Sequence, residues 1–226
     1  MPLLKHITLP KLSFVLWKID ETEGELMALL PPLLRQHYDD RLQTFSHQER
    51  RLEWLATRVC VHHSLGIEVP IDYRENGSPY LKESPLRISV SHSRGKVAVI
   101  VSEFPVGVDI EFITEKAHQL QSRFLTSEEQ TILSEILSTN LPTIACVKAW
   151  AAKEAAFKYY SHTSPIKLLA DTRLTKVNKD IFSLQSLKKE TCHVLHFSHG
   201  NYVIAVALGE NVHRTYRDII DAFQTQ

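Results

Sequence analysis

An internal echo in the sequence does most to limit the folds that this chain can adopt. Each half contains a helical segment with a tryptophan, then a Ser-His pair, then an apolar strand pattern. These parts lie at residues 54–58, 91–92 and 96–99 in the first half, and at 150–154, 198–199 and 201–206 in the second. Apolar strands resemble one another by chance, but the shared order indicates duplication of an α+β unit of roughly a hundred residues.

The duplication predicts an α+β fold with two similar lobes related by a pseudo-twofold axis. We place the N-terminal lobe at residues 1–104 and the C-terminal lobe at residues 105–226. Because ligands often bind between two lobes, we expect the active site in the cleft between them. An internally duplicated chain can close its own cleft, so we expect a monomer.

The composition excludes several classes of function. Lys plus Arg and Asp plus Glu both number 26, so no net charge indicates nucleic acid or an acidic membrane as a partner. Three widely spaced cysteines predict neither a disulfide framework nor a zinc ribbon. The N-terminus lacks the apolar segment of a signal peptide, and the apolar run at residues 97–101 has only strand length. These features predict a cytoplasmic protein.

Local patterns predict most of the elements that position the candidate residues. Capping-box spacings that begin at Ser46 and Thr126 predict helices that end near residues 65 and 137. Pro142 is expected to open a helix that runs to residue 160. The other expected elements are strands at 14–19 and 106–110, a helix at 21–30, a turn at 76–77, a hairpin at 88–102 and a strand pair at 194–208.

Two short acidic segments are the strongest candidates for chemistry. In the expected strand, Asp109 and Glu111 are two residues apart, so both carboxylates face the same side. In the expected helix, Glu154 and Lys158 are four residues apart and share a face. Taken alone, the first pair could be a solvated edge-strand pair and the second an ordinary surface ion pair. Together, three acids from two elements suit one hard divalent cation, and the lysine beside them suits a phosphate.

His92 lies at the end of an apolar strand pattern, within Ser91-His92-Ser93. It could be a hairpin residue that bonds its own turn, or a hydrogen-bond donor to a phosphate. The spaced histidines His193 and His196 would face opposite sides of a strand, so they do not predict a zinc site. No GxSxG elbow is present to indicate a serine nucleophile.

The order of these motifs resembles that of the 4′-phosphopantetheinyl transferases, specifically the longer, surfactin-synthetase-activator type. The resemblance covers about residues 30–158. Its segments are NGSPY at 76–80, SVSHS at 89–93, GVDIE at 107–111, RFLTSEE at 123–129 and WAAKEAAFK at 150–158. The resemblance implies a two-lobed, pseudo-symmetric fold. It also implies an enzyme that transfers the 4′-phosphopantetheine arm of coenzyme A to a serine of an acyl or peptidyl carrier protein and releases 3′,5′-ADP.

The resemblance also implies a role for each matching residue. Asp109, Glu111 and Glu154 would hold Mg2+, with Mn2+ also open, against the pyrophosphate. Lys158 would meet the α- or β-phosphate, and Glu154 or a metal-bound water would take the serine proton. The implied coenzyme A contacts are His92 to the 3′-phosphate with Ser91 beside it, Lys153 less directly to a phosphate, Gly77 and Pro79 at the adenine loop, and the basic residues Arg50, Arg51 and Arg58.

The sequence departs from the family pattern at two places. Ser78 stands where the family has a lysine that helps to bind coenzyme A, and residues 159–165 replace a Gly-rich turn near the carrier-protein side. The first departure leaves open a non-catalytic protein that binds coenzyme A or a carrier protein. A metal-dependent phosphohydrolase that uses the same three acids is a further alternative.

The expected docking region for the carrier protein lies between residues 115 and 142. This region is helical by pattern and has apolar residues that a carrier protein could contact. The same residues could instead belong to the core of the lobe. They are Phe124, Leu125, Ile132 and Leu133.

Overall fold

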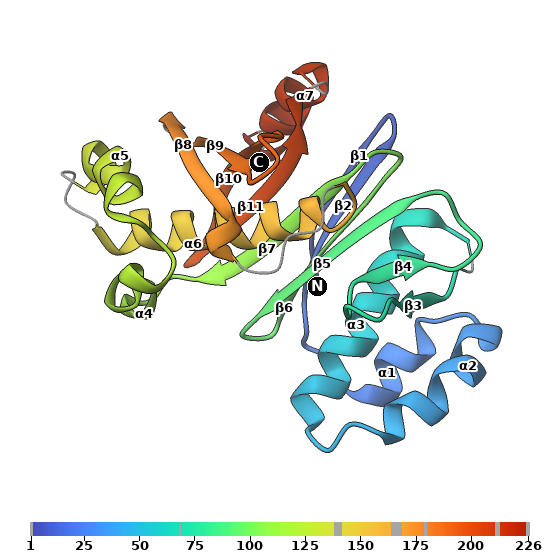
Figure 1. Cartoon of the computed structure of the whole chain (residues 1–226). Helices are drawn as coiled ribbons and strands as arrows, with labels where there is room; N and C mark the ends of the chain where they lie inside the picture. The colour runs from blue at the N-terminus through green and yellow to red at the C-terminus, as the bar shows by residue number, and fades with distance from the viewer. Residues whose placement is uncertain are drawn as a thin grey trace. The chain divides into compact units, whose positions relative to one another are not determined.

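The computed structural model describes residues 2–67, 69–137, 142–163, 169–178, 180–210 and 213–224. The chain divides into two compact units, Met1–Phe104 and Pro105–Gln226. Each unit mixes helices with an antiparallel sheet and has its own apolar core, which agrees with the predicted α+β class (Figure 1). The pseudo-twofold axis and the cleft between lobes stay predictions.

The first unit is built on a four-stranded antiparallel sheet. Its order is β1 (Leu3–Leu9), β2 (Leu12–Lys18), β6 (Lys96–Ser102) and β5 (Arg87–Ser93). The long helix α3 (Gln48–Leu65) packs on β2 and β6, and residues 53–61 of this helix are buried. The remaining elements are α1 (Glu23–Ala28), α2 (Pro32–Gln43) and the small hairpin of β3 (Ile71–Tyr73) with β4 (Pro79–Leu81).

Local signals explain where several of these elements begin and end. Pro32 is the first residue of α2, where its fixed φ suits a helix start. Gly66 ends α3 with a φ of 64°, the left-handed conformation that favours glycine at a helix end. The predicted capping box at Ser46 is wrong. The helix begins one residue later than that spacing requires, with His47 as an N-cap residue whose side chain makes no capping bond.

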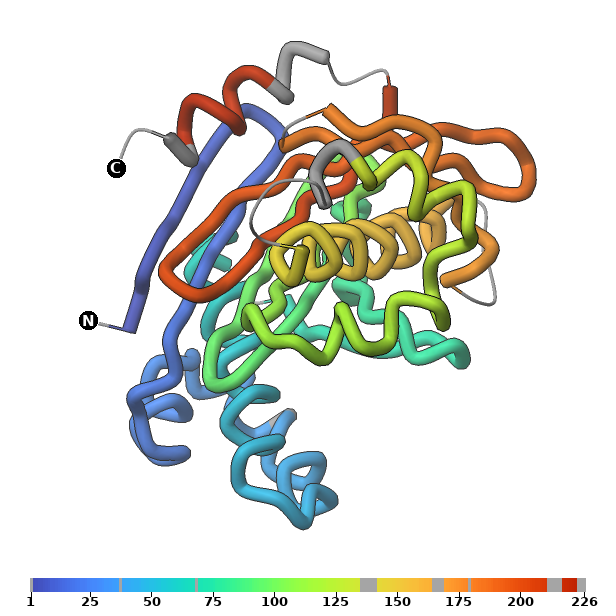
Figure 2. Tube along the Cα trace, turned by 90° about the vertical axis from the view of Figure 1, so that its left-hand side faces the viewer, coloured from blue at the N-terminus to red at the C-terminus, as the bar shows by residue number. Residues whose placement is uncertain are grey.

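The second unit is built on a five-stranded antiparallel sheet. Its order is β7 (Val106–Phe112), β11 (Tyr202–Gly209), β10 (Thr191–His199), β9 (Ile181–Ser186) and β8 (Thr172–Asn178). The helix α6 (Pro142–Tyr160) packs along β7, β11 and β10, and in Figure 2 it runs in gold over the strands of this sheet. The other helices are α4 (Glu115–Gln119), α5 (Ser127–Leu137) and α7 (His213–Gln224), with short 3-10 turns at Gln121–Arg123 and Leu169–Asp171.

Residues near the start of α5 confirm the predicted capping box and show which apolar side chains of the expected docking region belong to the core. Thr126 and Glu129 form the expected capping box: the Thr126 amide donates to Glu129 Oε2 at 2.8 Å, and the Glu129 amide donates to Thr126 Oγ1 at 3.2 Å. Phe124, Leu125 and Leu133 are buried in the core of the unit. These three side chains are therefore core residues, which was the stated alternative to contact with a carrier protein.

The two units share an order of connections. In each, one strand is followed by a long helix (α3 or α6) and later by a hairpin, and the strand pairs with the second strand of that hairpin. These pairings are β2 with β6 and β5 with β6 in the first unit, and β7 with β11 and β10 with β11 in the second. The common topology supports the duplication inferred from sequence.

Among the described helices, none combines the length and apolarity that a membrane span requires.

Candidate active site

β7 and α6 bring the three predicted acids of the second unit near one another. Asp109 lies within β7 opposite Ala205 of β11 and is 3% exposed. Glu111 lies two residues further along β7, and Glu154 lies on α6; both are half-buried. The charges of Asp109 and Glu154 both act on the Glu111 carboxyl. The three carboxylates therefore occupy one electrostatic site, although they come from segments more than 40 residues apart in the chain.

Burial makes this acidic group unfavourable in its fully charged form. Burial, and then the charges of Asp109 and Glu154, raise the pKa of Glu111 to about 7. Trp150 Nε1 donates a 2.9 Å hydrogen bond to Glu111 Oε1, which opposes that rise. Burial and the charge of Asp109 also raise the pKa of Glu154. A bound cation would relieve the repulsion that these shifts report.

Lys158 supplies positive charge to the same group. Its Nζ donates to Asp109 Oδ1 at 2.8 Å and to the Val108 carbonyl oxygen at 3.0 Å. These bonds link the C-terminal end of α6 to the middle of β7. The Lys158 side chain keeps 25% of its surface exposed, so it lies at the edge of the core rather than within it.

Gly107 allows α6 to lie close enough for these contacts. A Cβ atom at position 107 would lie 1.9 Å from the carbonyl oxygen of Ala155 and 2.8 Å from the amide nitrogen of Tyr159. Both are backbone atoms of α6, so no rotation of a side chain could make room. The first residue of the GVDIE segment therefore sets the distance between the strand that carries two acids and the helix that carries the third.

The chemistry of the acids suits a hard divalent cation, because such ions bind carboxylate oxygens. Within the described ranges, however, no three His, Cys, Asp or Glu side chains are grouped closely enough to hold a metal ion as they stand. Asp109 is engaged by Lys158 and Glu111 by Trp150. The acids therefore fit a Mg2+ ion in donor type, and their side chains would have to turn toward one another to bind it.

Lys153 is buried beside the site rather than exposed within it. Its Nζ lies 2.7 Å from Glu129 Oε1 and donates to the Thr172 carbonyl oxygen at 2.9 Å, and its side chain is 2% exposed. Glu129 Oε1 also accepts the Leu174 amide at 2.8 Å. These contacts join α6, α5 and β8. This placement favours a structural role for Lys153, which is to hold α6 in place. It does not favour the phosphate contact that the resemblance implies.

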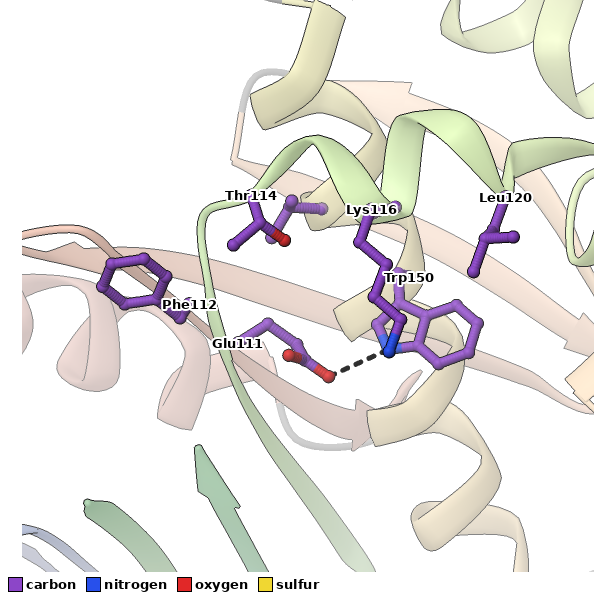
Figure 3. A pocket seen from close by; sticks show the side chains of 8 residues that line it. Glu111, Phe112, Thr114, Lys116, Leu120 and Trp150 are labelled. Atoms are coloured by element: carbon purple, nitrogen blue, oxygen red, sulfur yellow. Dashed lines mark hydrogen bonds between the residues drawn. The ribbon is translucent and has the colours of Figure 1, made fainter. Parts of the chain in front are cut away.

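An apolar cavity of about 250 Å3 adjoins Glu111 within the second unit. Its walls include Leu120, Val147 and the indole of Trp150, with Lys116 of α4 also at the cavity (Figure 3). Figure 3 shows the Glu111 carboxylate turned toward the Trp150 indole nitrogen, to which it is hydrogen-bonded. The acid group is thus next to a space that can take an uncharged chain.

The first unit gathers several of the other predicted residues around a second cavity, of about 150 Å3. Arg58, His92 and Pro79 line it, together with Arg50. Ser91 precedes His92 on β5 and is buried. Arg51 does not line the cavity; it forms an ion pair with Glu23 of α1. The structure therefore groups His92, Arg58, Arg50 and Pro79 and leaves Arg51 in a contact between helices.

The turn at Gly77 is confirmed and carries its own cation. Gly77 has a φ of 79°, and its amide donates to the Arg74 carbonyl oxygen at 2.8 Å. The Ser78 hydroxyl donates to Asn76 Oδ1 at 2.7 Å and accepts from Arg74 Nη1 at 3.3 Å. The Arg74 guanidinium lies 5.0 Å from the centre of the Tyr80 ring. Arg74 thus provides positive charge at this turn, beside Ser78.

Sequence reasoning missed two residues at these cavities and one at the turn. Glu53 lines the cavity of the first unit, Arg74 stands at the turn, and Lys116 lies at the cavity beside Glu111. Glu53 belongs to the buried segment 53–61 of α3, so an acid at a core position of a helix was the available signal. Arg74 and Lys116 gave no signal, because single basic residues in turns and short helices are usually solvated.

Comparison with known proteins connects this site to one family. Residues 105–207 match the sequence model of the 4′-phosphopantetheinyl transferase superfamily, a range that includes Asp109, Glu111, Glu154 and Lys158. The enterobactin synthase component D of Salmonella typhi is 28% identical over 187 residues, which cover 77% of this chain and 78% of that protein. The 4′-phosphopantetheinyl transferase AcpT of Escherichia coli O157:H7 is 38% identical over 93 residues, which cover 40% of this chain and 44% of that protein.

Proposed function

We propose that the chain belongs, through residues 105–207, to the 4′-phosphopantetheinyl transferase superfamily, and that it is a transferase of the surfactin-synthetase-activator type. Transferases of this superfamily move the phosphopantetheine group from coenzyme A to carrier proteins. In the proposed reaction, a serine oxygen of an acyl or peptidyl carrier protein bonds to the phosphate that bears pantetheine. The anhydride bond to 3′,5′-ADP breaks, and the serine proton is removed.

The observation that carries this proposal is the group of buried acids with Lys158 in the matched region. Burial, and then the charge of Asp109, raise the pKa values of both Glu111 and Glu154, and such perturbed acids are typical of functional sites. Asp109, Glu111 and Glu154 would hold Mg2+. When bound, this ion would neutralise charge on the pyrophosphate and on the leaving 3′,5′-ADP.

The residues of the chain have distinct proposed roles in the reaction. Glu154 would accept the serine proton, since burial and the charge of Asp109 raise its pKa and so make its carboxylate a better base. Lys158 would exchange its bond to Asp109 for one to a phosphate oxygen of coenzyme A. The apolar cavity lined by Trp150 would take the uncharged pantetheine chain away from water. Together these residues would orient the carrier serine against the anhydride.

Residues of the first unit would bind the nucleotide part of coenzyme A. His92 would donate to the 3′-phosphate, and the cations Arg50 and Arg58 line the same cavity. The turn at Gly77 and Pro79 would form the adenine loop, with Arg74 as its cation in place of the family lysine. We also propose that the protein acts as a monomer in the cytoplasm, without nucleic acid or membrane as a partner.

Intact mass of an apo acyl carrier protein tests the transferase directly. Incubation with this protein, coenzyme A and Mg2+ should add the mass of one phosphopantetheine group. The gain should disappear with EDTA and with Glu154→Gln. Glu128→Gln is the matched control, because Glu128 is an exposed acid of α5 that pairs with exposed Arg173. No gain across several carrier proteins would refute the proposal.

The same assay separates the two alternative functions. A phosphohydrolase that uses these acids would release 3′,5′-ADP and free phosphopantetheine when no carrier protein is present. A non-catalytic binding protein would bind coenzyme A and leave both coenzyme A and the carrier unchanged. Support for that second alternative came from Ser78, and the guanidinium of Arg74 beside Ser78 weakens it.

A further inference from the structure

Glu53 occupies an unusual place among the cations of the cavity in the first unit. The cavity of about 150 Å3 is lined by Arg50, Arg58 and His92, which suit an anion, yet Glu53 lines it as well. Glu53 is 8% exposed, and an acid so deeply buried is rare unless it is paired. An acid among anion-binding residues weakens anion binding unless it has another task.

The contacts of Glu53 show what that task is. Glu53 Oε1 lies 3.1 Å from His92 Nδ1, and Glu53 Oε2 accepts from Arg50 Nη1 at 3.2 Å. Burial raises the pKa of Glu53, but the hydrogen bonds and charges of His92 and Arg50 outweigh burial and lower it overall. The carboxylate is therefore ionised and uses one oxygen on each partner. The side chains of His92 and Arg50 are 35% and 52% exposed, so they form the accessible part of the arrangement.

Two consequences follow from a carboxylate on His92 Nδ1. The bond settles which ring nitrogen holds a proton toward Glu53, and so leaves the Nε2 edge for another partner. In the structure Nε2 faces the donor Arg50 Nη1, and a ring that carries a proton on both nitrogens would donate from Nε2 to an anion. The bond to Arg50 also limits a long side chain that would otherwise sample many rotamers. Both donors are thereby held in one orientation before an anion arrives, which reduces the ordering that binding would require.

Arg58 adds an unsatisfied donor to the same cavity. Its guanidinium lies 3.3 Å from the centre of the Trp54 ring, and its Nη1 and Nη2 donate to the Tyr73 hydroxyl at 3.3 Å and 3.2 Å. Arg58 is 2% exposed, and its Nε has no hydrogen-bond partner among the residues that the structure describes. Such a buried donor is unfavourable unless a ligand or water completes it.

We propose that Glu53 is a positioning residue that orients His92 and Arg50 for a terminal phosphate monoester, and that it thereby sets selectivity for coenzyme A over 3′-dephospho-coenzyme A. The inference rests on the proposed function for the identity of the substrate. Glu53 itself does not contact the phosphate, whose charge it would repel. Its effect passes through His92 and Arg50, so it should appear in the response to the 3′-phosphate and not in the response to the rest of the nucleotide.

Isothermal titration with 3′,5′-ADP and with 5′-AMP tests this inference without a carrier protein. The two nucleotides each carry one 5′-phosphate and differ only in the 3′-phosphate, so the ratio of their Kd values isolates that group. We expect the wild type to bind 3′,5′-ADP more tightly by a factor of ten or more. Glu53→Gln should reduce this ratio about tenfold and leave the Kd for 5′-AMP unchanged, since it weakens charge-assisted bonds to both donors. Glu49→Gln, an exposed acid in the first turn of the same helix, is the matched control and should keep the wild-type ratio.

Further variants distinguish positioning from a general structural effect. Glu53→Asp keeps the charge with a shorter reach and should give an intermediate ratio. In the double variant Glu53→Gln with His92→Ala, the loss should be smaller than the product of the two single losses, because both act on one contact. Equal weakening of both nucleotides in Glu53→Gln and in Glu53→Asp would overturn the inference, and so would a wild type that does not discriminate between them.

Transfer kinetics separate this inference from the proposed function. With a carrier protein, Glu53→Gln should raise KM for coenzyme A about tenfold with little change in kcat, and should leave KM for 3′-dephospho-coenzyme A unchanged. A wild type that transfers nothing but shows the expected nucleotide ratio would refute the transferase and retain the phosphate site. A wild type that transfers normally, with Glu53→Gln leaving both ratios intact, would refute the role of Glu53 alone.

Discussion

Substitution of Gly107 by alanine should separate the acids of β7 from the acid of α6. The new Cβ would lie 1.9 Å from the Ala155 carbonyl oxygen, whereas ordinary contact begins at 3.4 Å. The helix would therefore have to recede by about 1.5 Å, because contact at the shorter distance is strongly repulsive. The clashing atom belongs to the helix backbone, so trimming a neighbouring side chain would not restore the space.

The expected loss of activity follows from that displacement. A misplacement of about 1 Å at a reacting group can lower the rate about a hundredfold, so kcat/KM of Gly107→Ala should fall by at least that factor. Overpacking of a core contact should also lower the free energy of unfolding by about 1–3 kcal/mol. The rate of transfer to an apo carrier protein, followed by intact mass, measures kcat/KM. A reduced assay temperature keeps the variant folded because unfolding slows steeply on cooling. Urea unfolding measures the free energy of unfolding.

Gly24→Ala is the matched control for this substitution. Gly24 lies in α1, is not at a positive φ, and has no heavy atom within 4 Å of the place that a Cβ atom would occupy. Alanine there should leave transfer unchanged and raise helix stability by up to about 1 kcal/mol. A folded Gly107→Ala protein with kcat/KM within about threefold of the wild type would refute the view that this glycine sets the spacing of the site.

Three further predictions concern stability and substrate binding. Lys153→Met should destabilise the protein by about 3–5 kcal/mol in urea unfolding, because it removes the partner of the buried Glu129 carboxylate. The further change Glu129→Gln should recover part of this loss. A loss below about 1 kcal/mol in the single variant would contradict the buried ion pair. Burial, and then the charge of Lys148, lower the pKa of His196 from 6.5 to about 4, so the unfolded chain takes up this proton first and stability is lost as pH falls from about 6.5 to 4. The loss attributable to His196 is about 3 kcal/mol, so the stability advantage of the wild type over His196→Gln should shrink across that range, and a constant difference would contradict the shift. Arg74→Ala should raise KM for coenzyme A severalfold with kcat unchanged in the transfer assay, and an unchanged KM would show that this guanidinium does not replace the family lysine.

Much of the fold could be predicted because its signals are local. The capping box at Thr126, the proline that opens α6 and the glycine that ends α3 each act within one turn of helix. The predicted box at Ser46 failed because α3 begins at Gln48 with His47 at the N-cap, which places Ser46 and Glu49 out of the required positions. Strands β8 and β9 were not predicted with bounds, because each is short and its polar residues leave few apolar positions to mark a strand.

The chain by itself determined which residues could carry chemistry. Residue types and spacing placed Asp109 and Glu111 on one face of a strand and Glu154 with Lys158 on one face of a helix, since the periods of strand and helix are fixed by covalent geometry. Motif order then indicated a resemblance to one family. These conclusions depend on positions close together in sequence.

Only the tertiary structure decided which of those residues share a site and what each one contacts. It paired Lys158 with Asp109, buried Lys153 against Glu129, and placed Glu53 between His92 and Arg50. Each partner lies on a different element or a different turn, so its distance depends on how helices pack on sheets rather than on local spacing. Burial and neighbouring charge, which set the pKa values and the exposed donors, arise from that packing alone.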